Sequence, residues 1–308
     1  MSQESFTFKG ANEQEVFTWC WSTSEKPLGI LQIFHGMAEH AERYADFAGY
    51  MNAAGFTVYA CDLRGHGRTG EMNKSPNHLD NDGFNGIIED QILLSKLIQE
   101  KHPKTPHYVL GHSFGSFVAQ EYIKRFGGEI SGVILSASSM MEGLEIKAGS
   151  IIAMFSLIFG RRRPNKLIDY LSFGRYNKAI KNPSSKFSWL SRDEEQVKKY
   201  EADHYCGNVM STNFSYYFFK GLNRLYDVDR SNNIPKNLPI LILSGDNDPL
   251  GKYGQEVSKL HEWYKTLGIK DLQFKLYPGG RHEIINETNR NEVYQDISAW
   301  LQKHISNI

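Results

Sequence analysis

The residue types best suited to covalent chemistry lie in segment 111–115 (GHSFG), which has the form G-x-S-x-G. An apolar strand-like run, HYVLG, comes before it, and an amphipathic helix-like run, SFVAQEYIKRFG, comes after it. This context predicts a sharp strand-to-helix turn that presents the Ser113 hydroxyl at the carboxyl edge of a sheet. The two glycines suit such a turn because a residue without a Cβ lets neighbouring backbone approach closely. Ser113 is therefore the candidate nucleophile, and the flanking strand and helix argue against the alternative of a small-residue turn without chemistry.

Two backbone N–H groups are candidates to stabilise the negative charge on an attacked carbonyl. The first N–H groups of a helix lack intrahelical partners and lie at the positive end of its dipole, which makes the N–H of Phe114 one expected donor. The second is expected from segment 35–40 (HGMAEH), which follows the strand-like run GILQIF. We expect the N–H of Met37 to complete an oxyanion hole with that of Phe114.

A serine hydroxyl needs a histidine to accept its proton and a carboxylate to orient that histidine. His282 is the candidate base, because it lies in PGGRHEI after the last strand-like run, where paired glycines favour a loop. The run LILSGDNDPLG supplies two carboxylates, and we favour Asp248 over Asp246 because Asp248 precedes a proline and lies where the strand has given way to a loop. The chain order serine, aspartate, histidine supports this choice. His112 is expected to point away from the nucleophile.

Segment 35–40 also invites a metal interpretation, since two histidines and a glutamate lie close together there. Its spacing does not fit H-x-x-E-H, HExxH is absent, and no cluster of Asp, Glu or Cys completes a ligand set. The three cysteines, Cys20, Cys61 and Cys206, are far apart and odd in number, which indicates neither a disulfide framework nor a thiolate metal site. The sequence therefore predicts an enzyme without a metal or other cofactor, in a reducing compartment.

Strand-like and helix-like segments alternate towards both ends of the chain, which predicts an α/β fold with helices covering a largely parallel sheet. The strands are recognised as short apolar runs, and the helices by apolar residues at helical spacing. Strands are expected over 14–22, 28–34, 57–62, 107–111, 132–138, 238–245 and 272–278. Helices are expected over 42–55, 85–101, 116–127, 251–267 and 290–304.

Residues 140–236 break this alternation and are interpreted as an inserted cap, with 1–139 and 237–308 as the core. The cap holds an apolar helix-like run, SIIAMFSLIFG, followed by three arginines at 161–163. This composition fits a lid that touches a lipid surface with its charges at headgroup level, and it also fits a buried helix that covers an acyl tunnel, which we favour. Either version favours an acyl chain in the substrate. The later run KFSWLSRDEEQVKKYEADHYCG is expected to pack structurally.

Composition narrows the possible partners. Lysine and arginine number 35 against 35 acidic residues, so the strongly positive surface required for nucleic-acid binding is not expected. The longest apolar run, 148–160, is shorter than the roughly 20 residues that span a bilayer. The N-terminal MSQESFTFKG lacks the apolar stretch of a signal peptide. We expect a cytoplasmic protein whose cap makes transient contact with a membrane surface; the oligomeric state is left open.

Together these motifs resemble the monoacylglycerol lipase and lysophospholipase group of the α/β-hydrolases, which is also grouped with the serine aminopeptidases. The resemblance spans nearly the whole chain and is carried by HGMAEHAERYADFA, DLRGHGRTG, GHSFGS, SGDNDPLG and GGRHEI. It implies an α/β-hydrolase fold with an inserted helical cap. It also implies the triad and the oxyanion donors, which are Ser113, Asp248, His282, Met37 and Phe114.

The resemblance further implies that Glu39 and Arg43 line a polar pocket near the leaving alcohol. Their i, i+4 spacing at a helix start fits a plain surface ion pair equally well. The chain departs from the animal enzymes at Ile285, where those enzymes have a further polar histidine.

The expected function is a serine ester hydrolase that cleaves monoacylglycerols or lysophospholipids through an acyl-enzyme. An aminopeptidase of the same family is one alternative, and it would need a polar or acidic anchor for a free amine in the cap. A catalytically silent α/β-hydrolase that binds a ligand is the other. Labelling by a fluorophosphonate separates enzyme from binder, because only an activated serine reacts.

Overall fold

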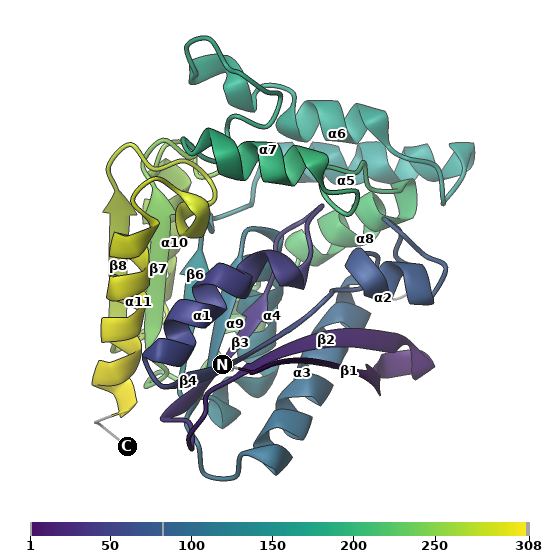
Figure 1. Ribbon diagram of the computed structural model, residues 1–308. Coiled ribbons are helices and arrows are strands. Elements are labelled where there is room, and N and C mark those ends of the chain that lie inside the picture. Colours follow the sequence, from purple (N-terminus) through teal and green to yellow (C-terminus); the bar gives the residue numbers. More distant parts are fainter. Residues whose placement is uncertain (1, 82, 306–308) are drawn as a thin grey trace.

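The computed structural model describes residues 2–81 and 83–305 of the chain (Figure 1). In this part of the chain, eight strands form one sheet in the order β1-β2-β4-β3-β5-β6-β7-β8. β2 pairs antiparallel with both β1 and β4, whereas all neighbouring strands from β4 to β8 are parallel. The strands are β1 Ser2–Lys9, β2 Glu15–Ser22, β3 Gly29–Phe34, β4 Phe56–Cys61, β5 His107–His112, β6 Gly132–Ser136, β7 Ile240–Gly245 and β8 Leu272–Tyr277.

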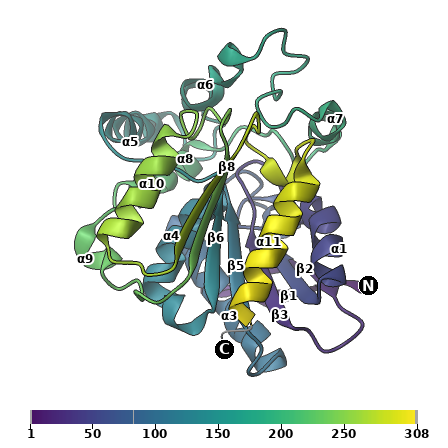
Figure 2. The same ribbon diagram turned by 90° about the vertical axis from the view of Figure 1, so that its left-hand side faces the viewer.

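Helices cover both faces of this sheet (Figure 2). α3, α4 and α10 pack on one face, where Phe117 and Val257 belong to the larger apolar cluster. α1 and α11 pack on the other face around Phe47 and Ile297. The helices outside the β6–β7 connection are η1 Ala11–Glu13, η2 Ala41–Tyr44, α1 Ala45–Ala53, α2 Gly67–Met72, α3 Gly83–Lys101, α4 Phe114–Phe126, η3 Gly127–Glu129, α10 Gln255–Thr266, η6 Ile284–Asn286 and α11 Arg290–Ile305.

The inner strands β3 to β7 are buried along their whole length. Their sequences are nearly continuous apolar runs, which is the pattern expected when helices cover both faces of a parallel sheet. The predicted α/β-hydrolase class, with a mostly parallel sheet between helices, is confirmed.

The N-terminal strand β1 was not predicted from the sequence. It pairs along its full length with β2 at the edge of the sheet. Most of its residues are exposed, so the strand has no buried apolar run that would mark it. The short helix α2, which follows β4, was also not predicted.

The segment between β6 and β7, residues 137–239, contains no strand of the sheet and will be called the β6–β7 segment. Its helices α5, α6 and α7 lie over the carboxyl ends of the parallel strands (Figures 1 and 2), while α8 packs against α5 and α3. No helix among the described residues combines the length and the apolar character needed to cross a membrane. The helices of the segment are α5 Leu144–Ser156, η4 Leu157–Phe159, α6 Lys166–Phe173, η5 Tyr176–Ala179, α7 Glu194–Ala202, α8 Thr212–Leu222 and α9 Val228–Ser231.

Candidate active site

Ser113 lies at the turn between β5 and α4, with φ 51° and ψ −117°. A positive φ is strained for a residue with a Cβ, and it persists only where the surrounding structure enforces it. The enforcement comes from close backbone packing. A Cβ on Gly115 would collide with the carbonyl oxygen of Phe34, and a Cβ on Gly111 would collide with the carbonyl oxygen of Gly115. The two glycines of the motif therefore allow the turn that presents Ser113 at the carboxyl edge of the sheet.

The structure brings together Ser113, His282 and Asp248. The Nε2 atom of His282 lies 2.8 Å from Ser113 Oγ, and its Nδ1 atom lies 2.8 Å from Asp248 Oδ2. All three side chains are buried. Asp248 is held in turn, because its Oδ1 accepts a hydrogen bond of 2.9 Å from the backbone N–H of Leu250. The arrangement suits transfer of the serine proton to a histidine whose tautomer is fixed by a carboxylate.

The electrostatic environment of His282 favours its protonated form. Burial by itself lowers the pKa of this imidazole, but the carboxylates around it, Asp248 first among them, together raise the pKa above its usual value. Glu283 and Glu39 act in the same direction. An imidazole with a raised pKa is a stronger proton acceptor, which is the property a general base requires.

Asp246, the other carboxylate of its loop, has a different contact. Its Oδ1 atom accepts a hydrogen bond of 2.7 Å from the backbone N–H of Gly279. This bond joins the loop after β7 to the turn after β8. Of the two candidates, Asp248 is therefore the one placed beside His282, and Asp246 holds the two loops together.

The ring of His112, which was expected to point away from the nucleophile, lines the cavity beside the ring of His282. Its ring centroid lies 5.1 Å from that of His282, and its Nδ1 atom lies 3.2 Å from Ser136 Oγ. Burial lowers the pKa of His112 to about 3, so its ring is neutral near neutral pH.

The ring of Trp189, from the β6–β7 segment, also packs on His282, with the two ring centroids 5.0 Å apart. The run around Trp189, expected to pack structurally, thus also contacts the candidate base.

The backbone of segment 35–40 is held by several hydrogen bonds. Gly36 N–H donates to Glu39 Oε1 at 2.5 Å, and Ala38 adopts a positive φ of 56°. The carbonyl oxygen of Ala38 accepts bonds from the Tyr200 hydroxyl at 2.8 Å and from the Gly207 N–H at 2.9 Å. The loop is therefore fixed both by its own glutamate and by the β6–β7 segment.

Met37 and Phe114, the expected oxyanion donors, line the same cavity as Ser113. Among the described residues, the N–H groups of Met37 and Phe114 have no hydrogen-bond acceptor. Unpaired N–H groups at the N-terminus of a helix and on a neighbouring loop can stabilise an oxyanion that forms between them.

Glu39 and Arg43 form an ion pair, but it is not the surface pair considered above. The side chains are 4% and 10% exposed, so the surface interpretation is wrong. Glu39 and Glu283 line the cavity, whereas Arg43, which pairs with both of them, does not. Glu283 lies within GGRHEI, and no role for it was predicted from the sequence. Its position next to the candidate base is the signal that could have drawn attention to it.

The cavity at Ser113 has a volume of about 830 Å³. Ser113, His282 and Glu39 line it, and most of its lining surface is apolar. A mostly apolar pocket with a few converging polar groups is typical of a small-molecule site. The apolar lining comes from α4, the loop after β6, α5, α6 and α8, and includes Phe114, Phe117, Met141, Ile146, Ile152, Ile168, Phe214, Phe218 and Phe219.

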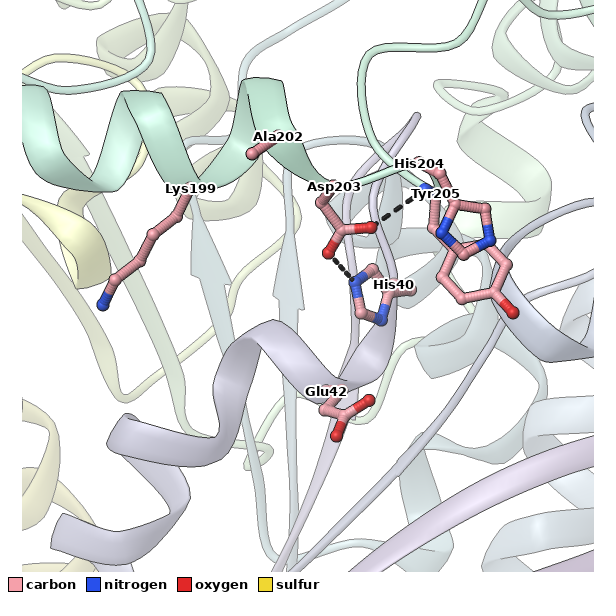
Figure 3. Close-up of a pocket in the computed structure, with 7 residues that line it drawn as sticks. All are labelled: His40, Glu42, Lys199, Ala202, Asp203, His204 and Tyr205. Atoms are coloured by element: carbon pink, nitrogen blue, oxygen red, sulfur yellow. Dashed lines mark hydrogen bonds and ion pairs between the residues drawn. The ribbon is translucent and has the colours of Figure 1, made fainter.

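One group of side chains in the described part of the chain has the chemistry of metal ligands: His40, Asp203 and Cys206. Two of its members, His40 and Asp203, line a second, open pocket of about 520 Å³ (Figure 3). His40 Nε2 already pairs with Asp203 Oδ2 at 2.8 Å, and Asp203 Oδ1 accepts the Tyr205 N–H at 2.9 Å. Burial raises the pKa of the Cys206 thiol, which disfavours the thiolate that metals bind. The group is best explained as a contact between segment 35–40 and the β6–β7 segment.

A mostly parallel sheet with a serine on the β5–α4 turn and a histidine–aspartate pair on adjacent loops defines a serine hydrolase of the α/β-hydrolase fold. Residues 25–289 match the family described as Serine aminopeptidase, S33, and the chain belongs to that family. The predicted enzyme class, a serine ester hydrolase, is confirmed, and neither the aminopeptidase nor the silent binder is favoured.

Relatives extend over the full chain. The chain is 27% identical over 311 residues to the monoacylglycerol lipase of Mycolicibacterium smegmatis, covering 99% of each protein. It is 24% identical to the monoglyceride lipase of Rattus norvegicus, covering 96% of this chain and 89% of the rat enzyme. Among solved structures, a thermostable carboxyl esterase from Bacillus coagulans in complex with glycerol superposes with a TM-score of 0.91, at 28% identity and 99% coverage of both chains.

Proposed function

We propose that this protein hydrolyses the ester bond of monoacyl lipids, monoacylglycerols or lysophospholipids, through an acyl-enzyme formed on Ser113. The observation that carries the proposal is the mostly apolar cavity that Ser113 and His282 line. Such a cavity suits a single acyl chain whose ester lies at the serine. The monoacylglycerol lipases among the relatives and the glycerol-bound esterase among the similar structures support the same substrate class.

The proposed reaction has two stages. His282 accepts the proton of Ser113 as Oγ attacks the ester carbonyl, and Asp248 stabilises the resulting imidazolium. The N–H groups of Met37 and Phe114 bind the oxyanion of the tetrahedral intermediate. His282 then protonates the leaving alcohol. In the second stage water attacks the acyl-enzyme with the same base, and the fatty acid leaves.

We propose that residues 140–236 form a cap on the core, 1–139 with 237–308, and that the cap contacts a lipid surface. Part of α5 is buried, as at Ile146, but much of the cap's apolar surface is exposed beside arginines 161–163. Apolar side chains next to basic ones suit the boundary between acyl chains and headgroups. A cytoplasmic location is part of the proposal, since the three cysteines are free and buried. The exposed apolar residues of α5, η4 and α6 are Leu144, Ile151, Met154, Phe155, Ile158, Phe159, Leu167, Tyr170 and Leu171.

Hydrolysis of a substrate panel tests the proposed reaction. The panel contains monoacylglycerols, lysophosphatidylcholine, short p-nitrophenyl esters and aminoacyl-naphthylamides, each assayed with Ser113→Ala as control. We expect turnover to concentrate on long monoacyl lipids and to fall by at least about 10³-fold in the variant. Turnover confined to short esters or aminoacyl amides would overturn the lipid assignment.

Binding to vesicles of phosphatidylglycerol and phosphatidylcholine tests the surface contact. Phe155→Ser and Ile158→Ser should each weaken co-sedimentation with vesicles while leaving turnover of a soluble short ester unchanged. Leu97→Ser is the matched control, because Leu97 is an exposed apolar residue of α3, outside residues 140–236. Equal vesicle binding by all three variants and the unchanged protein would contradict the contact.

A further inference from the structure

Three charged side chains form a buried cluster directly beside the candidate base. The Nη1 and Nη2 atoms of Arg43 donate to the two carboxylate oxygens of Glu283, each at 2.7 Å, and Nη1 also donates to Glu39. The side chains of Arg43, Glu283 and Glu39 are 10%, 5% and 4% exposed. Burying charges is costly unless they are paired with good geometry. The bidentate pair of Arg43 with Glu283 has this geometry, and it fixes the orientation of both side chains.

The two carboxylates of the cluster belong to different loops: Glu39 to the loop that carries Met37, and Glu283 to the loop that carries His282. Glu39 Oε1 accepts the Gly36 N–H at 2.5 Å and the Tyr44 hydroxyl at 3.0 Å, so it shapes the loop that carries Met37. Glu283 directly follows His282. Its backbone N–H donates to the Leu190 carbonyl at 2.7 Å.

Arg43 is the link between these two loops, which are 240 residues apart in sequence at the Arg43–Glu283 pair. Its guanidinium also lies 4.8 Å from the centre of the Tyr200 ring, whose hydroxyl donates to the Ala38 carbonyl at 2.8 Å. The side chains of Glu39, Arg43 and Glu283 therefore connect the oxyanion loop to the base loop through a chain of direct contacts.

We propose that Glu283 is a positioning residue that acts through Arg43 and Glu39 to hold the oxyanion loop at a fixed distance from His282. The inference rests on the proposed ester hydrolysis. Oxyanion donors are effective only when they lie within hydrogen-bonding distance of the developing charge, and a displacement of about 1 Å lowers a rate by roughly 10²-fold. A rigid buried ion pair between the two loops meets this requirement.

This role differs from binding of the leaving alcohol. Glu39 and Glu283 line the cavity, but Arg43 does not, and its two terminal nitrogens bind these two carboxylates. A residue that binds the alcohol matters only for substrates with that alcohol, whereas a residue that positions the oxyanion hole matters for every ester. The two roles therefore separate when the alcohol is changed and the acyl chain is kept.

The test compares a monoacylglycerol with the p-nitrophenyl ester of the same fatty acid, which has no glycerol. Glu283→Gln and Arg43→Lys should each lower kcat by about 10- to 100-fold on both esters, with KM changed by less than about threefold. A rise in KM confined to the monoacylglycerol would assign the cluster to alcohol binding. Unchanged kcat on both esters would also overturn the proposal.

Arg64→Lys is the matched control. Arg64 pairs with Asp90 in another buried ion pair, with side chains 10% and 2% exposed, and neither residue lines the catalytic cavity. We expect this variant to lower the melting temperature without lowering kcat. A loss of kcat in Arg64→Lys equal to that in Arg43→Lys would mean that any buried ion pair has this effect, and would overturn the proposal.

A double-mutant cycle and covalent labelling complete the test. If Arg43 and Glu283 act as one link, Arg43→Lys combined with Glu283→Gln loses no more kcat than the more damaging single change, and additive losses would contradict the link. The rate of labelling of Ser113 by a fluorophosphonate should fall in parallel with kcat. If the unchanged protein labels but cleaves no monoacyl lipid, the proposed function fails while the labelling rates still decide the positioning role.

Discussion

Trp189 and His282 pack ring against ring with their centroids 5.0 Å apart, and the backbone N–H of His282 donates to the carbonyl oxygen of Trp189 at 3.4 Å. Trp189 belongs to the β6–β7 segment, whereas His282 follows the last strand of the sheet. The segment that covers the cavity therefore also forms one wall around the candidate base.

The first prediction concerns this wall. Trp189→Ala should lower kcat by about 10-fold on all esters, because the imidazole loses the surface that restricts its orientation. Trp189→Phe keeps an aromatic surface and should remain within about threefold of the unchanged enzyme. Trp263→Ala is the control. Trp263 lies in α10, packs on Tyr226 and does not line the cavity. Equal activity of Trp189→Ala and Trp263→Ala would show that the ring contact is without consequence.

The two carboxylates of the SGDNDPLG loop give the second prediction. Asp248→Asn should lower kcat by on the order of 10³-fold, because an amide cannot fix the histidine tautomer or stabilise an imidazolium. Asp246→Asn keeps an oxygen that accepts the Gly279 N–H, so its kcat should stay within about threefold. Steady-state kinetics on a p-nitrophenyl ester check both. If Asp246→Asn proved the more damaging change, the assignment of the acid would be reversed.

The pH profile gives the third prediction. His282 must be neutral to accept a proton, so kcat/KM falls as the pH drops through the pKa of its imidazole. Burial lowers this pKa, but Asp248, Glu283 and Glu39 outweigh burial and raise it. Glu283→Gln removes one negative charge that favours the imidazolium. We therefore expect the pKa of His282 to fall in this variant. The acidic limb of the profile, where kcat/KM falls as the pH drops, should then move to lower pH.

The same profile distinguishes this electrostatic effect from a general loss of structure. His112, the other titratable ring beside His282, is neutral across the measured range because burial lowers its pKa to about 3. Arg64→Lys should leave the acidic limb where it is in the unchanged enzyme. A limb that moves to higher pH in Glu283→Gln would show that the carboxylate of Glu283 does not act on the base through its charge.

The turns that carry the candidate site could be predicted because each depends on short-range spacing. The glycines of GHSFG, the proline after Asp248 and the loop of GGRHEI each lie within a few residues of the side chain they position. The inner strands could be predicted because two covered faces require continuous apolar runs. The exposed edge strand β1 has no such run and could not be recognised.

Contacts between distant segments could not be predicted in this way. The partner of Arg43 that matters here, Glu283, lies 240 residues away, and nothing in a local pattern pairs the two. The contact of Trp189 with His282 depends on how the β6–β7 segment folds back over the sheet.

The last prediction concerns the length of acyl chain that the cavity accepts. Ile146 lies on α5, is 6% exposed and lines the cavity, whereas Ile151 on the same helix is 53% exposed and does not. Ile146→Trp fills part of the cavity, so kcat/KM for long-chain monoacylglycerols should fall by about 10-fold or more while p-nitrophenyl acetate turnover changes little. Ile151→Trp adds the same ring on the outer side of the helix and should leave the chain-length preference unchanged. If both variants kept the full preference for long chains, the acyl group would have to bind outside this cavity.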